Sequence, residues 1–305
     1  TRSPSGFIPM QFISFNSGQN AVYFSSMDGE SRAKDFSVDS RKKTLALIRY
    51  PENMGVTGSD LPDHYAVAFG PYQGGWLEAA HRYRDWALNQ VWTSKGPISQ
   101  RPDFPKSAIN IGFWIRDAWV WDLPDSVDKN MMNPFTWATD SRDPHEMNLP
   151  FLNLMKKAGI PIAFHWYGWH RTLFDNDYPH FLPPLPGFKE RVKELVDSGA
   201  VIVPYINALS ADSKTADWYR YDPYAIKDEE GGLRQKFYWD GAGRLTPMCP
   251  SQVPWHQTMT VLIDSIIGFY GTNGIYVDEV SCNSHELCFN KDHLHPLGGG
   301  RYWAD

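Results

Sequence analysis

The chain is poor in cysteine and lacks both long apolar runs and blocks of like charge. Its three cysteines are too few for a disulfide framework, although they leave room for one bridge and one thiol, and none has the CxxC spacing of zinc sites. No stretch approaches the roughly 18 consecutive apolar residues of a membrane-spanning helix. Charged residues make up 21% of the 305 residues and the net charge is −6, so we expect neither nucleic acid nor a membrane as a partner.

Motifs for nucleotide binding and for serine or cysteine nucleophiles are missing as well. No GxGxxG or Walker loop follows the first apolar run in the second part of the chain. No GxSxG motif supports a serine nucleophile, and no local context supports a Cys–His pair. We therefore expect neither nucleotide-dependent chemistry nor serine or cysteine catalysis.

Aromatic residues, in contrast, are abundant, at 15% of the chain with 13 Trp. Their flat apolar faces fill protein cores, and they also stack on the apolar faces of sugar rings. Composition alone favours the core role. The positions of the individual rings must therefore decide between the two.

Residues 1–91 are predicted to form part of an antiparallel β-sandwich that ends in a helix. Short β-prone runs separated by turn residues lie between residues 10 and 73. From Gly74 the apolar spacing changes to that of a helix. Residues 92–106 contain three prolines and are interpreted as a linker.

From residue 107 to residue 305, four apolar runs alternate with helical segments. The expected strands are residues 108–115, 161–164, 200–206 and 274–280, and the expected helices are 144–159, 187–199 and 254–270. Because the runs end in polar or aromatic residues, we predict an α/β fold that is the front part of a (β/α)8 barrel. A complete barrel has eight strands, so we expect the natural polypeptide to be longer.

The fourth run, GIYVDEVS at residues 274–281, carries the strongest site candidate. Asp278 and Glu279 are adjacent, and in a regular strand they point to opposite faces. We expect Asp278 to face the site as a catalytic residue and Glu279 to be turned away as an ion-pair partner. The alternative is that Asp278 only caps the strand end or binds an Arg.

The other strand ends supply residue types that suit a sugar, namely aromatic faces, imidazoles and carboxylates. The expected substrate-binding residues are Asp117, His165, Trp166, Asp177, Asn207, His293 and His295. His293 and His295 also permit a metal-dependent hydrolase that uses them with Asp278. We expect instead that they donate hydrogen bonds, and we predict no metal and no cofactor.

Several segments of the second part resemble an uncharacterised glycoside-hydrolase-like (β/α)8 barrel family, known as a domain of unknown function. Residues 70–87 resemble the sandwich end and connecting helix that precede such barrels. The resemblance runs in order across about 200 residues. The segments are HWYGWH (165–170), FDNDYPHFLPPLPGF (174–188), VPYINALSAD (203–212), PMCP (247–250), GIYVDEV (274–280) and LCFNKDHLHPLGGGRYW (287–303).

More distantly, the chain is similar to retaining α-galactosidase and α-glucosidase barrels. That resemblance implies that Asp278 occupies the nucleophile position and that the acid/base lies on a later strand, beyond Asp305. The likeness concerns strand order alone and does not carry over the substrate; we expect an oligo- or polysaccharide as partner. The alternative is a non-catalytic carbohydrate-binding or structural protein with a barrel-derived pocket. The sequence leaves the oligomeric state undetermined and the compartment open, with a secreted or periplasmic one slightly favoured.

Overall fold

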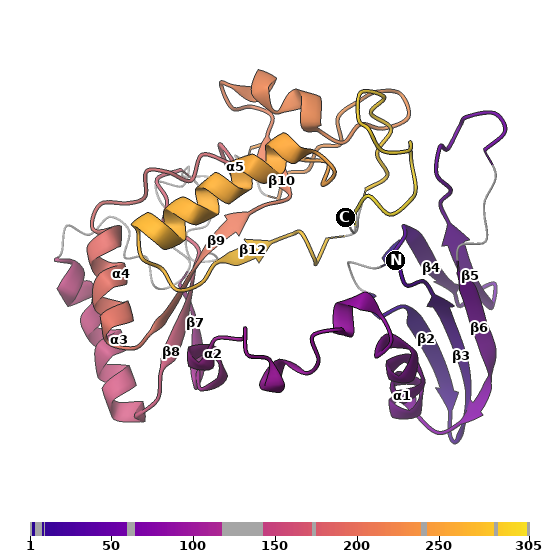
Figure 1. Ribbon diagram of the computed structural model, residues 1–305, viewed down its shortest axis with the longest axis horizontal. Helices are drawn as coiled ribbons and strands as arrows, with labels where there is room; N and C mark the ends of the chain where they lie inside the picture. Colours follow the sequence, from indigo (N-terminus) through magenta and orange to yellow (C-terminus); the bar gives the residue numbers. More distant parts are fainter. Residues whose placement is uncertain are drawn as a thin grey trace. The chain divides into compact units, whose positions relative to one another are not determined.

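The computed structural model divides the chain into two compact units, each described here by itself (Figure 1). Unit 1 comprises residues 1–102, 226–232 and 281–305, and unit 2 comprises residues 103–225 and 233–280. Residues 226–232 and 281–305 thus fall with the N-terminal strands rather than with the predicted barrel segment. The structure describes residues 2–3, 8, 10–59, 65–117, 143–172, 175–238, 243–283 and 286–303.

Unit 1 contains two three-stranded antiparallel sheets, ordered β2-β3-β6 and β1-β4-β5. Strand β3 alternates its side chains, so that Tyr23 lies in the cluster with Ala79 and Phe24 contacts Phe36 on β4. This alternation is what packs β3 on both faces. The strands are β1 (Arg2–Ser3), β2 (Phe12–Ser17), β3 (Asn20–Met27), β4 (Lys34–Asp39), β5 (Thr44–Arg49) and β6 (Ala66–Gln73).

Helix α1 (Trp76–Ala87) follows β6, as the helical spacing predicts. The Glu78 carboxylate accepts a hydrogen bond from the Gly75 backbone N–H at 2.7 Å, which satisfies one of the otherwise unpaired donors at the helix start. Ala79, Tyr83 and Ala87 lie on its buried face. Two short 3-10 turns, η1 (Val91–Thr93) and η2 (Ile98–Gln100), come next.

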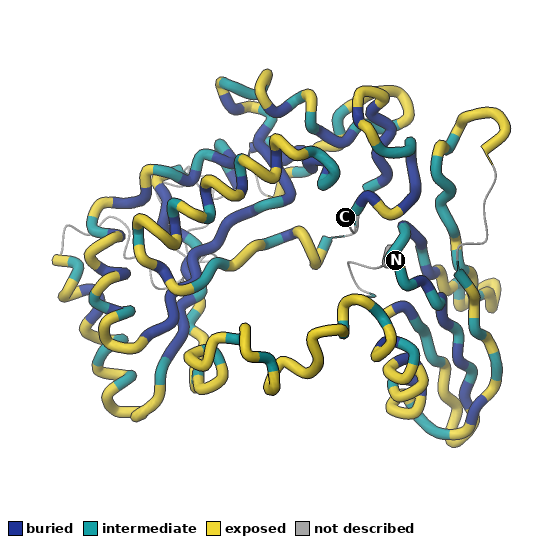
Figure 2. The backbone as a smooth tube through the Cα atoms, in the orientation of Figure 1, coloured by how far each residue is buried: buried dark blue, intermediate teal, exposed yellow. Residues whose placement is uncertain are grey.

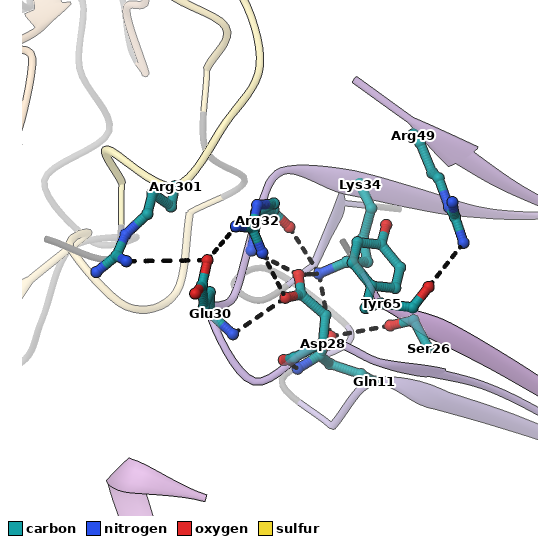
Figure 3. A network of polar contacts seen from close by, with 9 residues as sticks. All are labelled: Gln11, Ser26, Asp28, Glu30, Arg32, Lys34, Arg49, Tyr65 and Arg301. Carbon is teal, nitrogen blue, oxygen red and sulfur yellow. Dashed lines mark hydrogen bonds and ion pairs between the residues drawn. The ribbon is translucent and has the colours of Figure 1, made fainter. Parts of the chain in front are cut away.

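A buried ion pair stabilises the start of β4 in unit 1 (Figure 3). Lys34 Nζ lies 2.7 Å from Asp28 Oδ2, and both side chains are fully buried. Asp28 also accepts the backbone N–H groups of Glu30 at 3.0 Å and Arg32 at 2.7 Å. Burial is the largest influence on the Lys34 ammonium and lowers its pKa, while Asp28 opposes that shift.

Unit 2 is built on a parallel sheet with the order β12-β9-β8-β7. The four apolar runs are thereby confirmed as four parallel strands whose spatial order follows the sequence (Figure 1). This arrangement brings the carboxyl ends of all four to one edge. The strands are β7 (Phe113–Asp117), β8 (Ile162–Trp166), β9 (Val201–Asn207) and β12 (Tyr276–Asp278).

Helices α3 (Pro144–Ala158), α4 (Phe188–Asp197) and α5 (Val253–Asp264) contribute to the main core of unit 2. Asp143 caps α3 by accepting the His145 N–H at 2.7 Å, and Gly159 ends the helix in the left-handed region at φ 66°. Figure 2 shows the buried stripes that these helices and the strands contribute. The sheet residues in this core include Ile162, Phe164, Trp166 and Ile202.

The opposite face of the sheet carries the alternate residues. Ala163 on β8 and Val201 and Val203 on β9 form a second, smaller cluster there. Toward the sheet edges, large apolar side chains are exposed: Trp114 on β7 is 60% exposed and Tyr276 on β12 is 38% exposed. The parallel sheet therefore presents one face to helices and leaves part of the other uncovered.

Short elements complete unit 2. Strands β10 (Ser210–Asp212) and β11 (Leu245–Pro247) pair antiparallel. Among the described residues, no helix combines the length and apolarity that crossing a bilayer requires. The remaining elements are α2 (Lys106–Ile109), η3 (Trp218–Arg220), η4 (Asp222–Tyr224) and the π-helical turn η5 (Ser265–Phe269).

Candidate active site

Asp278 is the last residue of β12, at the carboxyl edge of the parallel sheet. In the register, Asp278 pairs with Asn207 on β9, two positions after Tyr276 pairs with Tyr205. Paired residues of parallel neighbours share a face, so Asp278 and Asn207 stand at the same rim position. Asp278 is half-buried and therefore accessible at that rim.

Asn207 is fully buried and shapes the loop after β9. Its Oδ1 accepts the backbone N–H groups of Leu209 at 3.1 Å and Ser210 at 2.9 Å. Its Nδ2 is buried and has no hydrogen-bond partner within the described part of the chain. A buried amide donor without a partner costs free energy unless a ligand or water accepts from it.

Glu279 does not follow the expected alternation. Its backbone lies in the left-handed region at φ 68°, so the strand geometry ends at Asp278. Ser210 Oγ donates to Glu279 Oε2 at 3.3 Å, and the Tyr238 hydroxyl donates to Oε1. Among the described residues its hydrogen-bond partners are thus the hydroxyls of Ser210 on β10 and of Tyr238, and the expected ion pair of Glu279 stays a prediction.

Asp175 is a third carboxyl in this region and follows β8. It is buried, its φ is 63°, and its backbone N–H donates to the Tyr178 hydroxyl at 2.9 Å. The pKa of Asp175 is raised to about 7, chiefly by burial and then by the charges of Glu279 and Asp278. The end of β12 and the loop that follows β8 thus place three carboxyl groups close enough to influence one another.

Tyrosines line the same region. Tyr167 stacks on Tyr205 with ring centroids 4.5 Å apart, and Tyr205 stacks on Tyr276 at 6.2 Å. Burial is the largest cause that raises the pKa of Tyr205, and the neighbouring Tyr178 and Asp278 carboxylate raise it as well. The Tyr167 and Tyr205 hydroxyls, whose pKa values are raised, therefore stay protonated near the carboxyl groups and can act as hydrogen-bond donors.

His165 belongs to this aromatic group. Its ring centroid lies 3.8 Å from that of Tyr276 and 4.5 Å from that of Tyr167. Burial, with a smaller contribution from Arg116, lowers the pKa of His165 to about 4, so the imidazole is neutral at neutral pH. Its Nε2 is buried and lacks a hydrogen-bond partner among the residues the structure describes.

The structure places two of the expected binding residues elsewhere. Trp166 is fully buried in the helix-facing core, where it packs against Phe188 with centroids 5.0 Å apart and under the Arg191 guanidinium at 4.5 Å. Asp177 Oδ1 lies 3.1 Å from His180 Nδ1, and its backbone N–H donates to Asp212 at 2.8 Å. Neither side chain joins the carboxyl groups and tyrosines around Asp278.

Three further expected residues are placed as follows. Asp117 ends β7 and pairs with Trp166 in the register, but its side chain lies outside the described residues. His293 and His295 lie in unit 1, in the segment 286–303. Of the expected site residues, the structure therefore brings Asp278, Asn207 and His165 to the same region of unit 2.

Asp175, Glu279 and the tyrosines were not among the expected site residues. Asp175 stands in the DND motif after β8, where the sequence favoured Asp177. Within a short loop the sequence does not show which carboxyl turns inward. A buried carboxyl with a raised pKa beside other carboxylates is typical of functional sites.

Curated relatives match the chain along nearly its whole length. A protein of Bacteroides thetaiotaomicron is 28% identical over 310 residues, covering 99% of this chain and 42% of that protein. A protein of Monosiga brevicollis is 25% identical over 329 residues, covering 98% of this chain and 27% of that protein. Both carry the name "Putative glycoside hydrolase", and the chain spans less than half of either.

Solved structures of the α-N-acetylgalactosaminidase of Bifidobacterium bifidum share the fold. The ligand-free form has a TM-score of 0.64 at 13% identity, covering 95% of this chain and 48% of that one. The complex with GalNAc has a TM-score of 0.65 at 15% identity, covering 95% and 46%. The mixed α/β architecture is therefore that of known barrel and sandwich glycosidases. The family described as Domain of unknown function (DUF6259) matches residues 62–305, and the chain belongs to this family.

Proposed function

We propose that unit 2 is the front part of a (β/α)8 barrel of a retaining glycoside hydrolase, with Asp278 as the nucleophile. The observation that carries the proposal is the position of Asp278 at the carboxyl end of the fourth parallel strand, among carboxyl groups that influence one another. Active sites of such barrels are built at that end. The names of the curated relatives support the same class of reaction.

In the proposed mechanism, an Asp278 carboxylate oxygen attacks the anomeric carbon of the substrate. The glycosidic bond breaks as a covalent glycosyl–enzyme ester forms, and an acid protonates the departing oxygen. Water then attacks the same carbon and releases Asp278, so that configuration is retained. Retaining enzymes hold the two carboxyl groups about 5 to 5.5 Å apart. We propose that the acid lies on a later strand, in sequence beyond Asp305.

The neighbouring residues fit roles in holding a sugar. The Asn207 Nδ2 and the His165 Nε2 are buried and have no partner among the described residues, so a substrate hydroxyl can satisfy them. The Asp278 charge raises the pKa of both Tyr167 and Tyr205, so these two tyrosines lie close to it. Asp175, protonated up to about pH 7, can donate a hydrogen bond to a hydroxyl and then accept one after ionising.

Glu279 is proposed to shape the site rather than to attack. Its two oxygens accept hydrogen bonds from Ser210 and Tyr238, which fixes the carboxylate in place. Its charge also contributes to keeping the proton on Asp175. Active sites often keep one carboxyl group protonated beside an ionised one, because the different environments of the two groups push their pKa values apart.

The test is hydrolysis of a glycan panel by the full-length protein and its Asp278→Asn variant. Removing a nucleophile is expected to lower kcat by at least about 10⁴-fold. Asp264→Asn, an exposed aspartate on α5, is the matched control and should keep full activity. With an activated substrate, Asp278→Gly plus azide should yield a glycosyl azide of inverted configuration. Undiminished hydrolysis by Asp278→Asn would show that the assignment is wrong.

A non-catalytic carbohydrate-binding function is the second candidate. The uncovered aromatic face of the sheet favours it, because Trp114 and Tyr276 are substantially exposed and sugars stack on such rings. Binding without hydrolysis predicts that the glycan panel gives affinity, measured by calorimetry, and no product. Asp278→Asn would then leave the turnover at the background level of the unaltered protein.

A further inference from the structure

The segment 286–303 of unit 1 gathers three side chains that commonly bind metals. One ligand atom from each of Cys288, His293 and His295 lies within 4.8 Å of the others. Cys288 is fully buried, His293 is 6% exposed and His295 is partly buried. This group belongs to unit 1, whereas the carboxyl groups of the candidate active site belong to unit 2, and the proposed glycoside hydrolysis gives it no role.

Neighbouring hydrogen bonds orient both imidazoles toward the cysteine. His293 Nδ1 lies 3.4 Å from Cys288 Sγ, while Nε2 lies 3.0 Å from the Asn290 side-chain amide. The His295 Nδ1–H donates to the Pro296 carbonyl at 2.7 Å, which leaves the lone pair on Nε2. The His295 contact matches the usual arrangement, in which a metal-binding histidine donates its other ring N–H to a carbonyl or a carboxylate. At His293 the Asn290 amide donates to Nε2, so binding a metal through Nδ1 moves the imidazole proton to Nε2 and turns the Asn290 oxygen toward it.

The surrounding backbone holds the group in position. The Cys288 N–H donates to the Tyr302 hydroxyl at 2.9 Å, and that hydroxyl donates to the Glu286 carbonyl at 2.8 Å. The Tyr302 ring also stacks on His295 with centroids 4.0 Å apart. The Gly298 N–H donates to the Cys288 carbonyl at 2.8 Å. Both ends of the segment are thereby fixed to the cysteine.

Position 299, close to this group in the sequence, accommodates only glycine. A Cβ on Gly299 would lie 2.1 Å from the Tyr50 carbonyl oxygen, so no other residue fits without moving the backbone. The Ala33 N–H donates to the Gly300 carbonyl at 3.0 Å, and the Met54 N–H donates to the Leu297 carbonyl at 3.1 Å. The segment is therefore attached to the N-terminal part of unit 1 through its backbone.

We propose that Cys288, His293 and His295 bind a zinc ion. The ligand atoms are the Cys288 thiolate, His293 Nδ1 and His295 Nε2, and a water or a further ligand takes the fourth tetrahedral position. One thiolate with imidazoles is a donor set that favours Zn²⁺ over Mg²⁺ or Ca²⁺. On binding, the Cys288 thiol releases its proton to solvent, so affinity falls as pH falls. This proposal is an alternative to the expectation of a chain without metal.

Metal analysis of the full-length protein, purified without chelators, is the primary test. The expected content is about one zinc per chain. After removal of zinc with a chelator, Co²⁺ should restore a site with an intense thiolate-to-cobalt charge-transfer band in the near ultraviolet. Absence of bound zinc, together with no such band at saturating Co²⁺, would overturn the proposal.

Variants locate the site and distinguish it from adventitious binding. Cys288→Ser should abolish the charge-transfer band. Cys282→Ser, which changes an exposed cysteine elsewhere in unit 1, should keep it. His295→Gln should weaken zinc binding, whereas His81→Ala, an exposed histidine on α1, should not.

A milder variant keeps the test valid if Cys288→Ser does not fold. His293→Gln removes one proposed ligand and keeps the cysteine, and it should weaken zinc affinity, measured by competition with a chromophoric chelator. Unchanged zinc affinity in both His293→Gln and His295→Gln would show that these side chains do not hold the metal. Glycan hydrolysis is not a readout here, so failure of this proposal is independent of the proposed function.

Discussion

Asp175→Asn tests whether the buried carboxyl beside Asp278 carries its proton at neutral pH. In the folded protein its pKa is raised from 3.8 to about 7, chiefly by burial and then by Glu279 and Asp278. In the unfolded chain the group is exposed and titrates near its ordinary value. Between the two values the folded state binds more protons than the unfolded state, so stability falls as pH rises.

The magnitude follows from the size of the shift. Each pKa unit corresponds to about 1.4 kcal/mol, so ionisation of Asp175 costs the folded state about 4 kcal/mol above pH 7 and almost nothing below about pH 4. Asparagine has nearly the same shape and no charge. Asp175→Asn should therefore stabilise the protein by about 4 kcal/mol at alkaline pH, and the gain should shrink toward zero in acid.

The assay is urea unfolding of both proteins over a range of about pH 4 to about pH 9. Because the chain has two compact units, amide hydrogen exchange in β8 and β9 should be measured in parallel to report unit 2 alone. Asp264→Asn on α5 is the control, since this carboxyl is exposed. A stability difference for Asp175→Asn that does not change with pH, or that reverses sign in alkali, would refute the reasoning.

Two further variants test buried groups whose charge state matters for stability. His170 is buried, and burial lowers its pKa to about 4, so the folded state should lose about 3 kcal/mol of stability as pH falls from about 6.5 to about 4. His170→Phe removes this titration and should therefore move the pH midpoint of acid unfolding, measured by circular dichroism, to lower pH. An unchanged midpoint would contradict this reasoning. Lys34→Met should lower the free energy of unfolding of unit 1 by about 3 to 5 kcal/mol, because it leaves the buried Asp28 carboxylate without its ammonium partner. Lys42→Met, an exposed lysine, should change that free energy by less than about 0.5 kcal/mol, and an equal effect of the two lysine variants would contradict the buried ion pair.

The sequence by itself determined the local elements of this protein. Helical spacing located α1 and α4 to within a few residues, because an apolar stripe repeats at the period of the helix whatever the helix packs against. The continuous apolar runs located β8, β9 and β12 for the same kind of local reason. The position of Asp278 at a strand end also followed directly from the residues on either side of it.

Only the tertiary structure decided which polar side chains meet. Glu279 turns into the left-handed region and accepts from Ser210, a contact across 69 positions that no local pattern specifies. Asp175, rather than Asp177, is the carboxyl of its loop that is buried beside Asp278 and Glu279. Trp166 faces the helices because a strand alternates its side chains and His165 takes the other face. Burial and charge at these positions arise from segments far apart in the chain, so the chemistry of the site depends on how those segments pack.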